Sequence, residues 1–333
     1  MTLTQVQTPL LEVANLCTTF TAGGASIPAV RNVGFTLNRG EVLGLVGESG
    51  SGKSVTLRSI LGLSRRYGET TGEVLWRGDN LVAMPESSLR PIRGGEIAMI
   101  FQEPMTSLNP LLTVGVQIDE TLKAHTRMTA SERKKRAIEM LDLVGIPAAR
   151  SRLGEYPHQF SGGMRQRVMI AIALAARPKL LLADEPTTAL DVTIQAQILD
   201  LILSLAKDFD MGVILVTHDL GVVAQTCDQV AVMYAGRIVE EGAVRAVLKS
   251  PQHPYTVGLM RSVPQNVPPR TPLYSIPGTP PSLLNLPQGC AFAPRCPNRS
   301  SACDQSRPEL LDTGGGRALA CFNKVRAGEG AAA

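Results

Sequence analysis

The sequence has 333 residues, which at about 150 residues per domain suggests two packing units. Hydrophobic residues make up 44% and charged residues 19%, the composition of a folded globular protein rather than a disordered one. The 33 lysines and arginines exceed the 29 acidic residues by only four, and aromatic residues make up 4%. Neither value supports nucleic-acid binding.

No segment is long and apolar enough to cross a membrane. The longest near-continuous apolar run, Val168 to Ala176, is far shorter than the roughly 20 residues that a spanning helix needs. The first residues lack the basic start and apolar core of a signal peptide. We therefore expect a soluble, cytosolic chain, in which clustered thiols more often bind metal than form disulfides. Cys17 and Cys227 stand alone in apolar surroundings and are interpreted as small buried hydrophobes.

Short apolar runs alternate with helical patterns from residue 10 to about 250, as in a layered α/β domain. Residues 113–145 are predicted to be helical, with an apolar stripe that includes Ile138, Leu141, Leu143 and Val144 and with the ERKKR run on the solvated face. The predicted strands cover residues 10–20, 30–37, 41–46, 72–77, 96–101, 180–183, 213–217 and 230–234.

The composition changes after Lys249. Residues 251–333 contain 13 of the 23 prolines, a density that disfavours helices and central strands. We expect an irregular extension, which would need additional stabilisation, such as a bound metal, to be ordered.

A glycine-rich loop follows the third predicted strand. The segment GESGSGKS at 47–54 matches the P-loop pattern and is followed by a helical stretch. The glycines let backbone N–H groups surround the β- and γ-phosphates of a nucleotide at a helix N-terminus. Lys53 supplies a charge to the same phosphates, and the Ser54 hydroxyl can coordinate Mg²⁺. The predicted phosphate-binding residues are Gly47, Ser49, Gly50, Ser51, Gly52, Lys53 and Ser54.

Two carboxylates end the apolar strand KLLLADE, at the edge where a doubly wound sheet places its chemistry. Asp184 is predicted to hold Mg²⁺, and Glu185 to polarise the attacking water as general base. A buried strand that merely ends in an acidic turn is the alternative.

The segment FSGGMRQ at 160–166 opens a long helix, and its Ser161, Gly162 and Gly163 form a second anion site at a helix N-terminus. With Met164, these residues resemble the LSGGQ signature of ATP-binding-cassette ATPases. The resemblance extends in order over most of the first 250 residues. It implies a Q-loop glutamine, a D-loop aspartate and a switch histidine at Gln102, Asp191 and His218. His125, His158 and His253 lack such a context and are interpreted as structural.

The resemblance implies a P-loop NTPase core of RecA type with an antiparallel β subdomain, a helical subdomain at about 103–160 and the irregular Pro- and Cys-rich extension. Residues 1–250 would form the nucleotide-binding domain. In this family the signature binds the ATP held by a partner subunit, so that ATP closes a dimer and hydrolysis opens it. The helical subdomain grips the membrane subunits. Phe20 would stack on adenine, although a core role fits it equally well.

The detailed sequences of the motifs resemble those of the oligopeptide/dipeptide importer branch, as do the segments HPYT at 253–256 and GCAFAPRCP at 289–297. This chain has Phe160 in place of the leucine and Met164 in place of the glutamine of the LSGGQ signature, and both replacements are shared with that branch. The resemblance implies an active ATPase on the cytoplasmic face of the cell membrane. Its partners would be a second homologous ATPase in a heterodimer, two permeases and an extracytoplasmic binding protein.

Two questions stay open. The branch also includes importers of nickel, glutathione and other small solutes. The accessory ATPase of the carbon–phosphorus lyase complex, which is a soluble protein, has similar motifs. A DNA-repair ATPase is disfavoured, because this chain has no room for long coiled coils between the P-loop helix and the signature helix. The extension's thiols lack paired C-x2-C knuckles, which argues against zinc. A 4Fe–4S cluster, which some members of the branch carry there, is favoured, and unligated thiols are a third interpretation. These thiols belong to Cys290, Cys296, Cys303 and Cys321.

Overall fold

The computed structural model describes residues 8–102, 107–187, 191–263 and 274–325. The chain forms two compact units. The described part of the first comprises residues 38–41 and 83–216, and that of the second residues 8–37, 42–82 and 217–325. No helix among these residues has the length and apolar character to cross a membrane.

The first unit has a parallel sheet in the order β8–β7–β6, formed by Gly212–Thr217, Leu180–Asp184 and Ile97–Ile100. All five residues of β7 are buried, as expected for a parallel strand covered on both faces. Helices α2 (Glu86–Gly95) and α8 (Val192–Asp208) also belong to this unit. The sheet confirms the strands predicted here, whereas α2 was not predicted.

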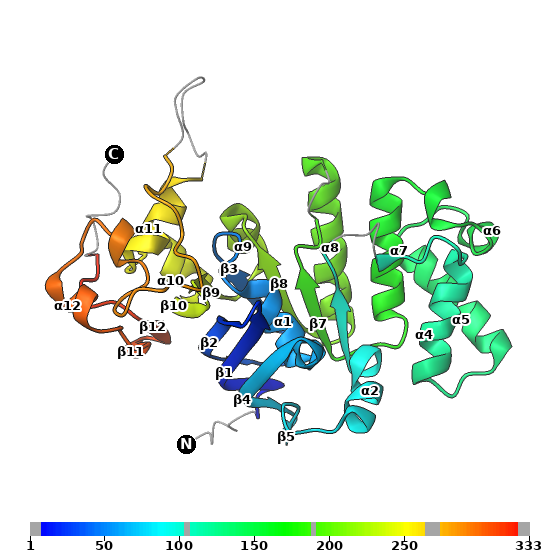
Figure 1. Cartoon of the computed structure of the whole chain (residues 1–333). Coiled ribbons are helices and arrows are strands. Elements are labelled where there is room, and N and C mark those ends of the chain that lie inside the picture. The colour runs from blue at the N-terminus through cyan, green and yellow to red at the C-terminus, as the bar shows by residue number, and fades with distance from the viewer. Residues whose placement is uncertain (1–7, 103–106, 188–190, 264–273, 326–333) are drawn as a thin grey trace, which may run out of the picture. The chain divides into compact units, whose positions relative to one another are not determined.

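Helices α4 (Val114–His125), α5 (Ala130–Leu143) and α7 (Gly162–Leu174) pack against one another, and the short α6 (Ala149–Arg152) contacts α5 (Figure 1). Thr129 begins α5 with a capping box, in which its hydroxyl accepts the Glu132 N–H. The predicted pattern is wrong at two positions of α5. Leu143 is exposed, and Arg136 of the ERKKR run is buried, because its guanidinium donates to the Ala175 carbonyl of the neighbouring segment.

The second unit contains two sheets. An antiparallel sheet has the order β2–β1–β4–β5, and the turn between β1 and β2 contains Gly23 and Gly24 at positive φ. The other sheet runs β11–β12–β10–β9–β3, with β3 parallel to β9. The strands are Leu11–Ala22, Ala25–Leu37, Val42–Val46, Gly68–Trp76, Asp79–Asn80, Gln229–Tyr234, Arg237–Ala243, Leu311–Gly314 and Arg317–Leu319 for β1–β5 and β9–β12.

The proline-rich extension is more regular than predicted. It contributes β11, β12 and the helices α11 (Pro254–Arg261) and α12 (Ser301–Gln305). Pro254 occupies the first turn of α11, where its missing N–H costs nothing. The helices that precede the extension in this unit are α1 (Lys53–Ile60), α9 (Leu220–Thr226) and α10 (Val244–Lys249).

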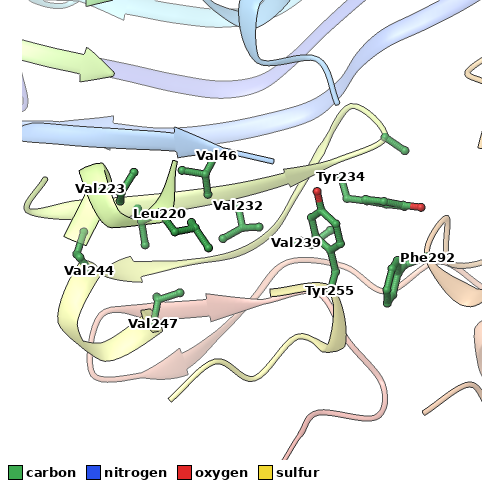
Figure 2. Close-up of a cluster of buried hydrophobic side chains, with 12 residues drawn as sticks. Val46, Leu220, Val223, Val232, Tyr234, Val239, Val244, Val247, Tyr255 and Phe292 are labelled. Carbon is green, nitrogen blue, oxygen red and sulfur yellow. The ribbon is translucent and has the colours of Figure 1, made fainter. Parts of the chain in front are cut away.

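An apolar cluster joins the extension to β9 and β10. Tyr255 of α11 and Phe292 pack against Tyr234 of β9, with ring centroids 4.6 Å apart for the tyrosines and 5.2 Å apart for Tyr234 and Phe292 (Figure 2). Valines of β9, β10 and α10 complete the cluster. A buried aromatic cluster therefore helps to order the extension, which was expected to need additional stabilisation.

Candidate nucleotide site

The P-loop connects β3 to α1, as predicted, and its shape requires glycine. Gly47 has a φ of +150°, and a Cβ there would lie 2.2 Å from the Met233 carbonyl oxygen. At Gly52, φ is +103° and a Cβ would lie 2.5 Å from the Ala29 oxygen. The loop also accepts a hydrogen bond from Gly236 N–H at the Ser51 oxygen, at 2.8 Å. The turn that follows β9 therefore packs directly on the loop.

Lys53 lies inside this loop. Its side chain is nearly buried, and Nζ donates to the carbonyl oxygens of Gly47 at 2.8 Å and Glu48 at 3.0 Å. Ser51 is buried, Ser54 is half-buried in the first turn of α1, and Ser49 and Gly50 are exposed. An ammonium group held by loop carbonyls at a helix N-terminus is the electrostatic environment that an anionic phosphate requires.

Phe20 lies near the end of β1, half-buried and paired with Gly68 of β4. A Cβ at Gly68 would lie 2.7 Å from Phe20 Cδ1, so the ring rests on glycine backbone.

The two carboxylates end β7 in the first unit. Asp184 is fully buried. Glu185 adopts a left-handed backbone conformation with a φ of +45°. Its N–H donates a hydrogen bond to the Val216 carbonyl oxygen at 3.0 Å, which stabilises this conformation. Gln102, two residues after β6, donates from Nε2 to Glu185 Oε2 at 3.2 Å. The structure thus brings together the predicted Q-loop glutamine and the predicted general base, because parallel β6 and β7 end side by side.

The signature begins α7. The Ser161 hydroxyl accepts the Met164 N–H at 3.4 Å as N-cap, and Ser161 and Gly162 are exposed. A Cβ at Gly162 would meet nothing within 4 Å, whereas one at Gly163 would lie 3.1 Å from Ile194 of α8. Phe160, which replaces leucine, is buried as an anchor. The helix N-terminus is therefore open to an anion.

Asp191 caps α8, and its Oδ1 accepts the Ile194 N–H at 2.9 Å. The preceding residues 188–190 of the predicted D-loop lie outside the described residues. His218 is exposed immediately after β8, where Asp219 caps α9 by accepting the N–H groups of Gly221 and Val222. Asp191 and His218 thus lie at element termini and are exposed, like Ser161 of the signature.

The structural interpretation of the other histidines fits their surroundings. His125 lies against the backbone of Gly94, and His158 stacks on Tyr156 at a centroid distance of 5.7 Å. His253 is buried and caps α11, with Nδ1 accepting the Tyr255 N–H at 3.0 Å.

Four thiols of the extension, all free, line one small pocket together with His253 and Phe292. Burial raises the pKa of these thiols at three positions, to about 12 in the case of Cys321. Among the described residues, no group of three or more histidine, cysteine or acidic side chains is placed to hold a metal ion. The expected metal site is therefore not preformed. The raised values belong to Cys290, Cys296 and Cys321.

Sequence reasoning missed three residues around the P-loop. Glu48 of the loop forms an ion pair with Arg295 at 2.7 Å, and its N–H donates to the Tyr255 hydroxyl at 2.8 Å. The HPYT and PRC segments that contain these partners were noted as branch features, but nothing in their spacing indicates the P-loop.

The P-loop, the carboxylate-ended strand and the capped signature helix define an ATP-binding-cassette ATPase. The "ABC transporter" family model matches residues 30–188, and the "Oligopeptide/dipeptide transporter, C-terminal region" model matches residues 239–303. The chain belongs to the ABC transporter family, in its oligopeptide/dipeptide branch, and it has the P-loop fold of that family.

The chain is 50% identical over 327 residues to the oligopeptide transport ATP-binding protein OppD of Salmonella typhimurium, with 97% of each chain covered. It is 52% identical over 301 residues to the dipeptide transport ATP-binding protein DppD of Bacillus subtilis, with 90% of each covered. Among solved structures, the ATP-binding cassette MJ0796, a dimer bound to ADP and Pi, is 33% identical with a TM-score of 0.64. That similarity covers 71% of this chain and 99% of the cassette.

Proposed function

We propose that this chain is the ATP-hydrolysing subunit of an importer of di- and oligopeptides. The ATPase activity is supported above all by Lys53, which lies within a glycine-shaped loop at a helix N-terminus. The substrate class is supported by relatives whose names specify oligopeptide or dipeptide transport and which match at least 90% of the chain.

ATP is bound through its phosphates by the P-loop, from Gly47 to Ser54, with Lys53 between them and Phe20 against adenine. Ser54, Gln102 and Asp184 offer hydroxyl, amide and carboxylate oxygens, the donors that Mg²⁺ prefers. Mg²⁺ held by these residues would neutralise charge on the phosphates.

Glu185 acts as general base for the attacking water. Its hydrogen bond to Gln102 fixes the carboxylate, and the left-handed backbone at Glu185 directs the chain out of β7. We propose His218, which follows β8 directly, as the switch residue.

The signature residues Ser161, Gly162, Gly163 and Met164 bind the ATP of a second, homologous ATPase subunit, and Asp191 belongs to the same interface. We propose that residues 1–250 are the nucleotide-binding domain, that the helices at about 103–160 contact two permeases, and that residues 251–333 are a branch-specific extension. The assembly works at the cytoplasmic face of the membrane with an extracytoplasmic binding protein.

Pull-down of the tagged chain from native membranes in gentle detergent, followed by mass spectrometry, tests this assembly. Two permeases, a second ATPase and a binding protein are expected, and the binding protein should stimulate ATP hydrolysis when loaded with a defined peptide library. Stimulation by nickel or glutathione in place of peptides would contradict peptide import. A soluble enzyme complex as the sole partner would contradict the transporter function.

We further propose that the four thiols of the extension bind a 4Fe–4S cluster rather than zinc. The number and type of donors fit a cluster, and the thiols line one pocket with apolar walls.

Metal content of anaerobically purified protein tests this second proposal. About four irons per chain, lost in a Cys303→Ser variant, are expected. Stoichiometric zinc without iron, or protein with neither metal, would contradict it. A Cys17→Ser variant is the control, because that thiol lies in β1 and accepts the Asn32 N–H.

A further inference from the structure

The second residue of the P-loop, Glu48, is held by two residues of the extension. Arg295 contacts both carboxylate oxygens of Glu48, with Nη1 at 2.7 Å from Oε2 and Nη2 at 2.9 Å from Oε1. The Tyr255 hydroxyl accepts the Glu48 N–H at 2.8 Å. Residues separated from the loop by more than 200 positions therefore fix both the side chain and the backbone of Glu48.

Arg295 is itself rigidly placed. Its side chain is 4% exposed, against 26% for Glu48. Besides the bidentate pair, Nη1 donates to the Tyr234 hydroxyl at 3.2 Å, and Nε donates to the Pro277 oxygen at 3.0 Å. The guanidinium carbon lies 5.9 Å from the centroids of the Tyr234 and Phe292 rings. A planar fork with several partners in a buried setting fixes its acceptor in one orientation.

Glu48 transmits this constraint to the phosphate-binding lysine. The Glu48 carbonyl oxygen accepts the Lys53 ammonium at 3.0 Å and the Ser51 N–H at 3.2 Å. The backbone that Arg295 and Tyr255 hold in place is thus the backbone that positions Lys53. Arg295 can therefore act on Lys53 through Glu48, whose carboxylate it contacts directly.

Charge gives the pair a second role. A carboxylate on a loop that binds polyphosphate repels its ligand at short range, and a buried bidentate arginine cancels that charge. Because both Nη atoms of Arg295 contact the carboxylate, the arginine acts on the loop rather than as a phosphate ligand.

We propose that Arg295 is a positioning residue for ATP binding, which neutralises Glu48 and fixes the P-loop backbone around Lys53. The extension is then part of the nucleotide site rather than an appendage. This inference rests on the proposed ATPase function.

The test is nucleotide affinity in the assembled transporter, measured with a fluorescent ATP analogue, together with KM and kcat for MgATP. Arg295→Gln is expected to raise the dissociation constant and KM on the order of tenfold, with kcat changed less than about twofold. Arg295→Lys keeps the positive charge but loses the two-pronged hydrogen bonding of the guanidinium. Its dissociation constant and KM should lie between those of the wild type and those of Arg295→Gln.

The double variant Arg295→Gln/Glu48→Gln separates this role from general stability. Removal of the unneutralised carboxylate should restore most of the affinity lost in Arg295→Gln, even though the double variant makes no ion pair. Arg299→Gln is the matched control, since Arg299 belongs to the same extension but pairs with Asp304 near the surface, with 52% and 45% of the side chains exposed.

Three results would overturn the inference: an affinity of Arg295→Gln within about twofold of the wild type, a double variant no tighter than Arg295→Gln, or an equal loss in Arg299→Gln. If Arg295→Gln does not fold, the comparison of Arg295→Lys with Arg299→Gln decides. Wild-type protein that fails to bind the analogue would instead contradict the proposed ATPase function, which keeps the two failures distinct.

Discussion

Gln102 donates a hydrogen bond to the Glu185 carboxylate at 3.2 Å, although 83 positions separate the two residues. The contact exists because β6 and β7 are parallel neighbours whose carboxyl ends meet at one edge of the sheet. The glutamine thereby holds the carboxylate of the proposed base.

Substitution of Glu185 by glutamine should leave ATP binding intact and lower kcat about 10²- to 10⁴-fold, since an amide cannot accept the proton of the attacking water. Nucleotide affinity and turnover of the assembled transporter measure this, and the closed dimer should accumulate with bound ATP. Asp142→Asn, on an acidic residue at the end of α5, serves as the control. Undiminished hydrolysis in Glu185→Gln would remove this residue from its role.

The P-loop glycines should differ in their tolerance of alanine. A Cβ at Gly52 would lie 2.5 Å from the Ala29 oxygen at a φ of +103°, so backbone must move. A Cβ at Gly50, with φ at +78°, meets nothing within 4 Å, and only the left-handed conformation costs about 1–2 kcal/mol. Thermal unfolding without nucleotide should therefore show a larger drop in midpoint for Gly52→Ala than for Gly50→Ala. Equal drops would contradict the steric argument.

Local signals predicted the elements that carry the nucleotide motifs. A strand, a glycine-rich loop and a helix are contiguous in sequence, so the P-loop could be located from residues 41–61 alone. The two carboxylates followed an apolar run whose burial on both faces is typical of a parallel strand.

Features that depend on distant residues could not be predicted in this way. The strand β10 contains Glu240, whose charge breaks the apolar pattern, and the structure buries this carboxylate with Arg317 and the N–H groups of Gln252 and His253. The ion pair between Glu48 and Arg295 spans 247 positions, and neither residue carries a local sign of its partner.

The stability of the second unit should depend on pH through His253. Burial lowers the pKa of His253 to about 3, from about 6.5 when unfolded. As pH falls, the imidazole is therefore protonated in the unfolded chain before it is protonated in the folded chain. The free energy of unfolding decreases as pH falls from about 6.5 toward 3. Protonation would also remove the acceptor that caps α11.

Glu241 opposes this trend, because burial raises the pKa of its carboxyl to about 7 and the folded state gains a proton as pH falls toward 4.5. A comparison of the wild type with His253→Asn cancels that contribution, since asparagine keeps a capping oxygen and does not titrate. The unfolding midpoint of the wild type should fall relative to that of the variant between pH 8 and 5. A difference that stays constant with pH would contradict a neutral, buried His253.

Removal of the Tyr255 hydroxyl should weaken the P-loop from its backbone side. Tyr255 is fully buried, so Tyr255→Phe leaves the Glu48 N–H without its acceptor at a cost of about 1–3 kcal/mol. We expect the unfolding midpoint to fall by roughly 2–4 °C per kcal/mol, and the affinity for a fluorescent ATP analogue to fall with it, because the same backbone holds Lys53. Tyr274→Phe is the control, since that ring is 41% exposed in the extension. An unchanged affinity with a lowered midpoint would show that Tyr255 stabilises the extension without positioning the loop.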